Sequence, residues 1–237
     1  MHSSRLEQLR EFAGAKIGVE IDDWELLNTA LTHSSYTKEL DAHQENYERC
    51  EFLGDAVLKL VISDLLFKTF KNYREGELTK IRSTIVSDEF IAKLALKLEF
   101  DKYIQLGPAQ ARDGGAKKQS ILACGFEAVL GAFYLDGKTE EIKDFLKNLF
   151  TPELDNVAEN LCVYNSKALL QEYIQAKSKG LPVYTVTEEC GAAHKKTFEV
   201  VVSFENKVLG SGSGNSKKEA EKQAALEACV KLGLIKQ

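Results

Sequence analysis

Proline is scarce in this sequence, with three in 237 residues, while hydrophobic side chains make up 44% of the chain. That composition excludes a chain that is disordered throughout. Long apolar runs are also lacking, because the longest, 121–135, is interrupted by Glu127 and falls short of the roughly 20 residues that a bilayer requires. Residues 1–5 open no apolar segment, so we expect neither a secretory signal nor a membrane contact.

Closely spaced cysteines are absent as well. The five cysteines are odd in number and scattered, and no C-x-x-C pair occurs among Cys50, Cys124, Cys162, Cys190 and Cys229. This spacing argues against a disulfide framework and against a cysteine-ligated zinc site. We therefore expect reduced thiols in a cytoplasmic protein.

Positive charge is in deficit overall, since the net charge is −5, but it is unevenly distributed. Residues 164–237 contain 11 lysines and eight acids, a net charge of +3, whereas the preceding part carries −8. An acidic body followed by a mildly basic tail suggests two functions in one chain.

Residues 1–150 have the apolar periodicity of helices, with no sustained alternation of the strand type. The expected helices are 5–17, 24–31, 48–70, 78–97, 120–135 and 140–150. Gly107-Pro108 and residues 113–115 mark a loop before the 120–135 helix. The first domain is therefore predicted to be all-α.

The pattern breaks at Thr151-Pro152, and residues 151–163 are interpreted as a linker. Residues 164–234 then change character: a helix at 166–179, strands at 183–188, 197–204 and 207–209, and an alanine-rich helix at 216–232. The order α-β-β-β-α predicts a small α+β domain, a three-stranded antiparallel sheet covered by two helices.

Three acids share one face of the expected 48–70 helix. Glu48, Glu51 and Asp55 follow one another at spacings of three and four. The surrounding residues are so apolar that this helix is expected to be buried or nearly so. Like charges at this spacing destabilise a helix, and burial without partners costs far more. A positive group should compensate them, either Arg49 or a divalent cation.

Glu127 is the only charged residue between Lys118 and Asp136, and it needs a partner from another helix. Three carboxylates, Glu51, Asp55 and Glu127, converging from two helices would suit Mg²⁺ or Mn²⁺. The alternative, which helical spacing alone favours slightly, is a buried salt-bridge network. Its cations would be Arg49, Arg82 or Lys80.

The start of the last helix also concentrates unusual features. Ser216 and Glu219 have the spacing of a capping box, yet Lys217 and Lys218 lie in the first turn, where the helix dipole disfavours cations. A phosphate ligand would explain those lysines, and the upstream glycines at 212 and 214 would allow its close approach. An ordinary solvated helix face remains the alternative.

Several segments together resemble the ribonuclease III family. Residues 46–58 (NYERCEFLGDAVL) are similar to the family signature, usually written with E-R-L-E-F-L-G-D. Residues 30–36 (ALTHSSY), 75–82 (EGELTKIR) and 120–128 (SILACGFEA) are similar to further family segments in family order. Residues 212–225 (GSGNSKKEAEKQAA) look like the phosphate-contacting end of a double-stranded-RNA-binding domain.

The resemblance implies an all-α endonuclease domain that acts as a homodimer, and it favours the metal site over the salt-bridge network. By position, Glu51, Asp55 and Glu127 match the metal-binding acids, of which Asp55 and Glu127 are the expected catalytic pair. Glu48 matches a cleft-lining or supporting acid, and Phe52 the phenylalanine that packs across the dimer interface.

In the RNA-binding domain, the resemblance implies contacts with the minor groove and with phosphates of A-form duplex RNA, recognised by shape. The matching residues are Gln171, Glu172, Gln175, His194, Lys217, Lys218 and Lys222. His33 matches the family's A-L-T-H histidine, and we interpret it as a structural residue.

One position departs from the family pattern. An aspartate usually stands three residues before the glutamate matched by Glu127, and here that position is Cys124. A thiol is a poor Mg²⁺ ligand. Either a water replaces the missing carboxylate, with activity reduced or shifted toward Mn²⁺, or the chain is a non-catalytic double-stranded-RNA-binding, ribosome-associated protein. We favour retained activity, because the other acids are intact.

The expected activity is therefore an endoribonuclease that hydrolyses double-stranded RNA with Mg²⁺, or with Mn²⁺ as a substitute. Its products would carry 5′-phosphate and 3′-hydroxyl ends. Ribosomal RNA precursors and other structured RNAs are the expected substrates.

Overall fold

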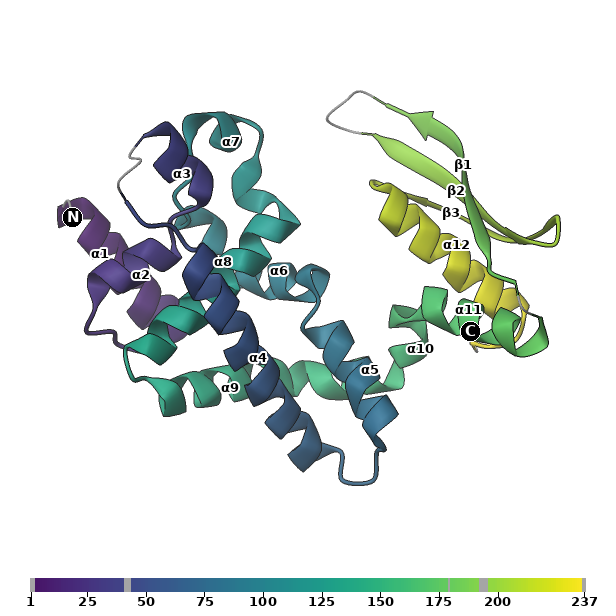
Figure 1. Ribbon diagram of the computed structural model, residues 1–237, viewed down its shortest axis with the longest axis horizontal. Helices are drawn as coiled ribbons and strands as arrows, with labels where there is room; N and C mark the ends of the chain where they lie inside the picture. The colour runs from purple at the N-terminus through teal and green to yellow at the C-terminus, as the bar shows by residue number, and fades with distance from the viewer. Residues whose placement is uncertain (1–2, 41–43, 179, 192–195, 236–237) are drawn as a thin grey trace. The chain divides into compact units, whose positions relative to one another are not determined.

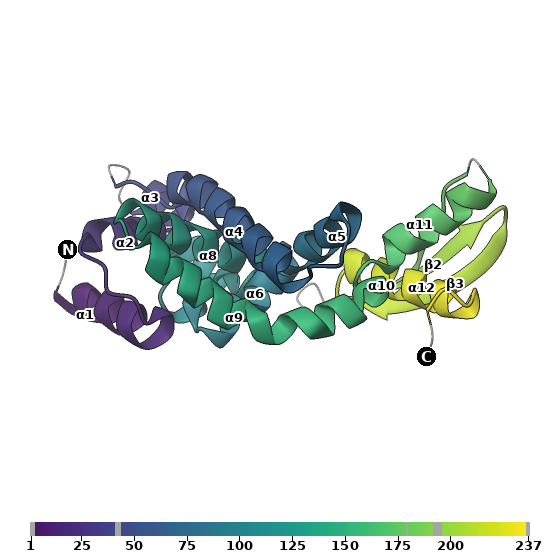
Figure 2. The same cartoon turned by 90° about the horizontal axis from the view of Figure 1, so that it is seen from below.

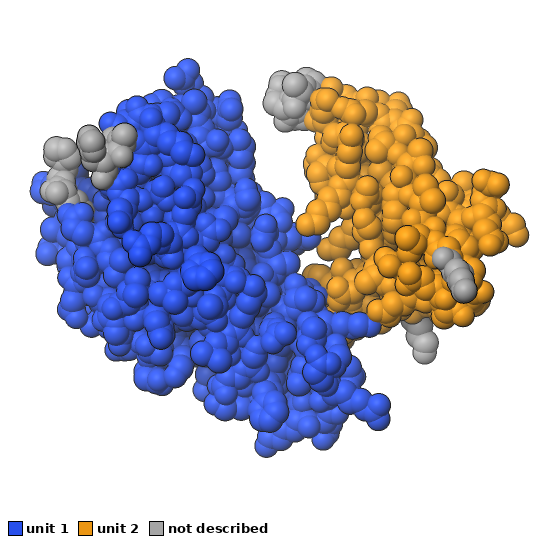
Figure 3. Space-filling view, in the orientation of Figure 1, with its two compact units in different colours: residues 1–156 blue, residues 157–237 orange. Residues whose placement is uncertain are grey.

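The computed structural model describes residues 3–40, 44–178, 180–191 and 196–235. The chain divides into two compact units, residues 1–156 and 157–237, coloured separately in Figure 3. No helix within the described ranges is both long enough and apolar enough to cross a membrane.

The first unit is helical, which confirms the predicted class (Figure 1). Its elements are α1 (Ser3–Glu11), the π-helical η1 (Phe12–Ile17), α2 (Trp24–Ala30), α3 (Ser34–Glu39), α4 (Glu48–Thr69), α5 (Glu75–Ile85), α6 (Asp88–Lys97), the 3₁₀ turn η2 (Phe100–Lys102), α7 (Pro108–Arg112), the 3₁₀ turn η3 (Gly115–Lys117), α8 (Gln119–Leu135) and α9 (Thr139–Glu159).

Helix α8 forms the centre of this unit. Most of its side chains are buried. Helix α4 packs against it, and Figures 1 and 2 show the two helices side by side. The ring of Phe126 contacts Phe100, which in turn meets Phe12 edge-on at 4.9 Å between ring centroids. The apolar run that the sequence shows at 121–135 is therefore the core of the unit.

The expected single helix over 78–97 is wrong in one respect, because two helices, α5 and α6, cover this region. Ser87 separates them in an extended conformation, and its hydroxyl accepts a hydrogen bond from the Phe90 amide at 3.4 Å. This N-cap starts a new helix where the apolar periodicity alone continues through the junction.

The predicted break at Thr151-Pro152 is also wrong, because α9 continues through Pro152 to Glu159. Proline removes one helical hydrogen bond, but the apolar period carries on past it. Leu146, Phe150 and Leu154 are spaced by four, and all three are buried. Burial of this stripe holds the helix together across the proline.

The second unit has the predicted order of elements, a helix, three strands and a helix. After the short α10 (Leu161–Tyr164) come α11 (Ser166–Lys177), β1 (Val183–Cys190), β2 (Thr197–Phe204), β3 (Lys207–Gly214) and α12 (Lys217–Lys231). The sheet is antiparallel in the order β1-β2-β3. Its core joins Leu170 and Ile174 of α11 to Val200 and Val202 of β2 and to the alanines of α12.

Strand β3 is longer than predicted and extends through the glycines that the sequence suggested as a ligand loop. Added Cβ atoms at Gly210 and Gly212 would overlap the backbone of α12 near Ala224. A Cβ atom at Gly214 would lie 2.8 Å from the backbone nitrogen of Ala220, also on α12. The close approach that these glycines permit is therefore between β3 and α12, and the expectation that Gly212 and Gly214 serve the approach of a ligand is wrong.

Candidate functional site

Two glycines bring the acidic residues of the first unit together. A Cβ atom at Gly54 of α4 would overlap the backbone oxygen of Glu127 on α8, and one at Gly131 of α8 would overlap the backbone oxygen of Cys50. The two helix backbones therefore touch at this crossing. Glu51 and Asp55 flank Gly54, so the crossing places them beside Glu127 as the spacing predicted.

The neighbouring acids shift the pKa of Glu127. Its side chain is partly buried, and burial, followed by the charges of Asp55, Glu51 and Asp88, raises the pKa of its carboxyl to about 7. The ammonium of Lys59 acts in the opposite direction on this pKa. The structure thus unites the three carboxylates that the sequence singled out.

Lys59 is a site residue that the sequence reasoning missed. Its Nζ lies 2.6 Å from Oδ2 of Asp55. Two of the three cations proposed as compensation have other partners: Arg49 is 3.7 Å from Glu45, and Arg82 donates a hydrogen bond to Ser63 at 2.9 Å. The available signal was the i,i+4 spacing of Asp55 and Lys59.

Cys124 lies one helical turn before Glu127 and is half-buried. Burial, a hydrogen bond to Glu51 and the charges of Glu51 and Glu127 raise the pKa of its thiol to about 12. The thiol is therefore protonated near neutral pH and donates to the Glu51 carboxylate. Tyr47, which the sequence did not single out, is buried and hydrogen-bonded to Cys124, and burial raises the pKa of its phenol.

Glu48 and His33 lie at the edge of this cluster. Glu48 is exposed in the first turn of α4, and its carboxylate partly offsets the effect of burial, which lowers the pKa of His33. The Nδ1 atom of His33 accepts a hydrogen bond from the Ser35 amide at 2.9 Å, which caps α3. The ring of His33 meets that of Tyr47 edge-on at 5.3 Å between centroids. These contacts fit the structural interpretation of His33.

The acids do not form a preformed ligand cage. Among residues 3–40, 44–178, 180–191 and 196–235, no group of three or more His, Cys, Asp or Glu side chains has the arrangement of a metal site. Asp55 is paired with Lys59, and Glu51 accepts from Cys124. The carboxylates share a location, but two of them have protein partners.

The second unit presents its predicted RNA-binding residues on two helices. Gln171, Glu172 and Gln175 occupy the exposed face of α11, opposite the buried Leu170 and Ile174. This division of faces leaves the three polar side chains accessible to a ligand.

The start of α12 carries the predicted lysines. The Ser216 hydroxyl accepts from the Glu219 amide at 3.2 Å, so Ser216 caps the helix as the spacing predicted. The Glu219 carboxylate accepts from the Asn215 amide at 2.8 Å, one residue before the Ser216 amide that a capping box uses. Lys217 and Lys218 in the first turn are exposed. The cap is occupied by protein groups, while the lysines remain available for phosphate.

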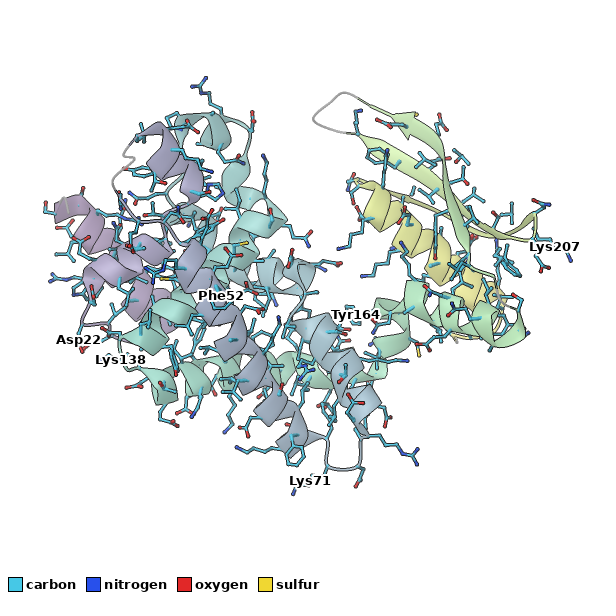
Figure 4. The ribbon with its side chains drawn as sticks, in the orientation of Figure 1. Asp22, Phe52, Lys71, Lys138, Tyr164 and Lys207 are labelled. Carbon is cyan, nitrogen blue, oxygen red and sulfur yellow. The ribbon has the colours of Figure 1, made fainter. Side chains whose placement is uncertain are left out.

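Lys222 is half-buried, and its ammonium lies 5.6 Å from the ring centre of Tyr164, which is labelled in Figure 4. Lys217 lies over Phe198 at 5.7 Å. His194, the remaining predicted RNA contact, lies outside the described residues.

The apolar helix α4 is less buried than its sequence predicts. Phe52, labelled in Figure 4, is 83% exposed, Leu60 68% and Phe67 72%. Their spacings of eight and seven place them on one face of the helix. The expectation of a nearly buried helix is therefore wrong, because this face has no cover within its own unit.

Two family descriptions match the chain. Residues 23–154 match the family described as ribonuclease-III-like, and residues 166–232 match the double-stranded RNA binding motif. A ribonuclease 3 from Caldanaerobacter subterraneus subsp. tengcongensis is 42% identical over 221 residues, which cover 93% of this chain and 97% of that protein. The chain belongs to the ribonuclease III family.

Further relatives agree. A ribonuclease 3 from Bacillus licheniformis is 42% identical over 233 residues, which cover 98% of this chain and 93% of that protein. The solved nuclease domain of ribonuclease III from Campylobacter jejuni, described as having a region involved in dimer formation, superposes with a TM-score of 0.55 at 37% identity. The match covers 59% of this chain and 94% of that one.

Family membership confirms the predicted fold and class of enzyme. The chain is a ribonuclease III-type endoribonuclease with a double-stranded-RNA-binding domain. The ribonuclease-III-like match includes the α4–α8 crossing, and the RNA-binding match includes α11, the sheet and the start of α12.

Proposed function

We propose that this ribonuclease III-type enzyme cleaves double-stranded RNA by divalent-metal-dependent phosphodiester hydrolysis at the α4–α8 crossing. The expected products carry 5′-phosphate and 3′-hydroxyl ends. The observation that carries the proposal is the convergence of Glu51, Asp55 and Glu127. Together with burial, the charges of Asp55 and Glu51 raise the pKa of Glu127 to about 7.

The donor set fits a hard divalent cation. Glu51, Asp55 and Glu127 supply carboxylate oxygens, the ligands that Mg²⁺ and Mn²⁺ prefer. Burial, followed by repulsion from Asp55 and Glu51, disfavours the ionised form of Glu127, and the ammonium of Lys59 offsets this only in part. These three residues would hold Mg²⁺, with Mn²⁺ as a substitute, and Glu48 would support the cleft.

When bound, the cation would polarise a phosphoryl oxygen and lower the pKa of a water molecule. Asp55 and Glu127 are the residues to which we assign the catalytic role. Without the cation, burial and the neighbouring acids favour the protonated form of Glu127, and binding of the cation would favour its ionised form. Glu51 is held toward the site by the thiol of Cys124.

Cys124 supports the second candidate function, a double-stranded-RNA-binding protein without catalysis. A protonated thiol offers no anionic oxygen where the family pattern has aspartate. We favour the nuclease, because the carboxylates that the pattern also requires are present at one crossing. Water filling the vacant ligand position would preserve the site at reduced affinity, consistent with a shift toward Mn²⁺.

The RNA-binding domain would hold the duplex, since the nuclease domain is acidic. Gln171, Glu172 and Gln175 would contact a minor groove, and His194 would contact a second one. The phosphates of the intervening major groove would be bound by Lys217, Lys218 and Lys222. In this division of roles the nuclease domain (1–150) and the RNA-binding domain (164–234) are joined by residues 151–163, a segment that comprises the end of α9 and most of α10.

The uncovered face of α4 supports a homodimer. Phe52, Leu60 and Phe67 form an exposed apolar stripe, which is rarely left in water without a partner. A pocket of about 520 Å³, lined by Phe67, Phe70 and Tyr73 among others, extends this surface at the α4–α5 turn. We assign Phe52 to the interface between two copies, each cutting one strand of the duplex.

Ribosomal RNA precursors and other structured RNAs would be the substrates in the cytoplasm. The test of the function is cleavage of a long RNA duplex by the wild type and Glu127→Ala, with duplex binding measured alongside. We expect Glu127→Ala to bind RNA normally and to lose at least a thousandfold in cleavage rate. Undiminished cleavage by this variant would overturn the assignment.

A further inference from the structure

Lys59 forms an ion pair with Asp55, one of the candidate metal ligands. Its Nζ is 2.6 Å from Oδ2 of Asp55, one turn away on α4. The lysine and aspartate side chains are 53% and 38% exposed, so the ammonium can leave the pair for water. An exposed pair at this spacing contributes little to stability, so it is easily exchanged for another partner.

The same ammonium also acts on the second helix. Lys59 is the cation that offsets the effect of Asp55 and Glu51 on Glu127 of α8. The charge of Lys59 therefore acts on Glu127 as well as on Asp55. A lysine that paired only along its own helix face would not affect the pKa of Glu127. Asp64 and Lys68 form that simpler pair nine residues further along α4, at 2.7 Å.

Building on the proposed metal-dependent function, we propose that Lys59 is a built-in counter-cation of this site. It neutralises Asp55 while no divalent ion is bound and releases Asp55 when one binds. Lys59 would thereby set the metal affinity of the enzyme.

Two physical terms give the direction of the effect. A divalent ion that binds Oδ2 of Asp55 displaces the Lys59 ammonium from that atom, and the ammonium then remains on the same helix as a repelling charge. Both terms weaken metal binding, and both are screened by salt because the pair is partly exposed. Removal of the Lys59 charge should therefore tighten metal binding, most clearly at low ionic strength.

The experiment measures Mn²⁺ binding to the full chain without RNA, from the electron paramagnetic resonance signal of free Mn²⁺, at pH 8. We expect Lys59→Met to lower the dissociation constant about three- to tenfold at low salt. The difference should shrink in 0.5 M salt. Lys59→Arg, which keeps the charge, should restore the wild-type value.

Lys68→Met is the matched control, because it removes the same i,i+4 pair from the same helix away from Glu127. We expect it to leave Mn²⁺ affinity unchanged. An equal increase in affinity in Lys59→Met and Lys68→Met would reduce the effect to general surface charge and overturn the inference.

The remaining outcomes separate the inference from the function on which it depends. If the wild type binds Mn²⁺ and loses it in Glu127→Ala, but Lys59→Met has wild-type affinity, the metal site stands and the role of Lys59 is wrong. If the wild type binds no Mn²⁺, both the metal-dependent function and the inference fail.

Discussion

At the scale of single residues, the clearest functional feature is a carboxyl group in an apolar helix. Glu127 stands alone among apolar side chains in α8, and its pKa is raised to about 7 by burial and by Asp55, Glu51 and Asp88. The fold therefore keeps a group that is unfavourable when ionised. Such a cost is typical of residues retained for function.

The first prediction concerns the pH dependence of stability in EDTA. Because the pKa of Glu127 is raised on folding, the folded state binds more protons, and this group destabilises the wild type as pH rises from about 4.5 to about 7. We expect Glu127→Gln to be more stable than the wild type by about 1–2 kcal/mol at pH 8, allowing for partial solvent exposure, and nearly equal at pH 4.5.

Thermal unfolding of both proteins across this pH range measures the difference. An increase of this stability difference with pH, rather than its size at one pH, identifies the ionisation of Glu127. A difference in melting temperature between the two proteins that stays constant from pH 4.5 to pH 8 would contradict the account.

The sequence located the acids but not their partners. Helical spacing is enough to place Glu51 and Asp55 on one face, and isolation among apolar residues marks Glu127. Lys59 was overlooked because lysines four residues after an acid are common on any helix surface. The contact of Tyr47 with Cys124 joins segments distant in sequence, and no local pattern encodes it.

At the scale of elements, the type of each segment was predictable, whereas some ends and contacts were not. Periodicity identified most of the long helices and all three strands. The continuation of α9 through Pro152 depends on burial of Leu154, which tertiary packing supplies. The extension of β3 depends likewise on α12, whose backbone lies against Gly210 and Gly212.

The second prediction tests the α4–α8 crossing. In Gly54→Ala the new methyl group would overlap the backbone of Glu127, which no side-chain rotation can relieve. We expect a loss of at least about 3 kcal/mol in the free energy of unfolding, together with a loss of cleavage. Chemical denaturation provides the measurement.

Gly76→Ala is the control for this change, because nothing lies within 4 Å of its added Cβ. Alanine favours a helix over glycine, so this variant should be as stable as the wild type or up to about 1 kcal/mol more stable. Equal stabilities of the Gly54 and Gly76 variants would show that the helices do not touch at Gly54.

The third prediction concerns the start of α12. Replacing Lys217 and Lys218 together by alanine should weaken duplex-RNA binding and reduce the slope of log affinity against log salt by about two, one per lost phosphate contact. Binding titrations at several salt concentrations measure the slope.

Lys231→Ala is the control. This lysine lies at the other end of the helix, paired with Glu227, and its replacement should leave the slope unchanged. An unchanged slope in the double variant would contradict the placement of phosphate there.

At the scale of the whole molecule, charge separates the two roles. Residues 164–237 carry a net charge of +3 and the preceding part −8. Under the proposed function, the acidic catalytic site would repel phosphates until a cation is bound, and the basic domain would hold the RNA. The uneven charge along the sequence predicts this division of roles.

The fourth prediction concerns assembly. Replacing the exposed Phe52 by serine should raise the dissociation constant of the dimer at least tenfold, because a large apolar side chain would no longer be buried between copies. Sedimentation equilibrium of the full chain measures the change. Leu96→Ser, an exposed apolar residue on α6, is the control and should not alter assembly. A wild type that remains monomeric at all concentrations would refute the dimer.

The most direct test of the central claim is cleavage of a long RNA duplex by the purified wild type in Mg²⁺, Mn²⁺ or EDTA, with Cys124→Asp in parallel. We predict cutting into short fragments with either metal and none in EDTA. Cys124→Asp should improve the rate in Mg²⁺ more than in Mn²⁺, because a hard anionic oxygen replaces a protonated thiol. Failure of the wild type to cut with either metal, while Cys124→Asp cuts, would contradict the claim and show an RNA-binding protein that lacks catalysis because of one ligand position.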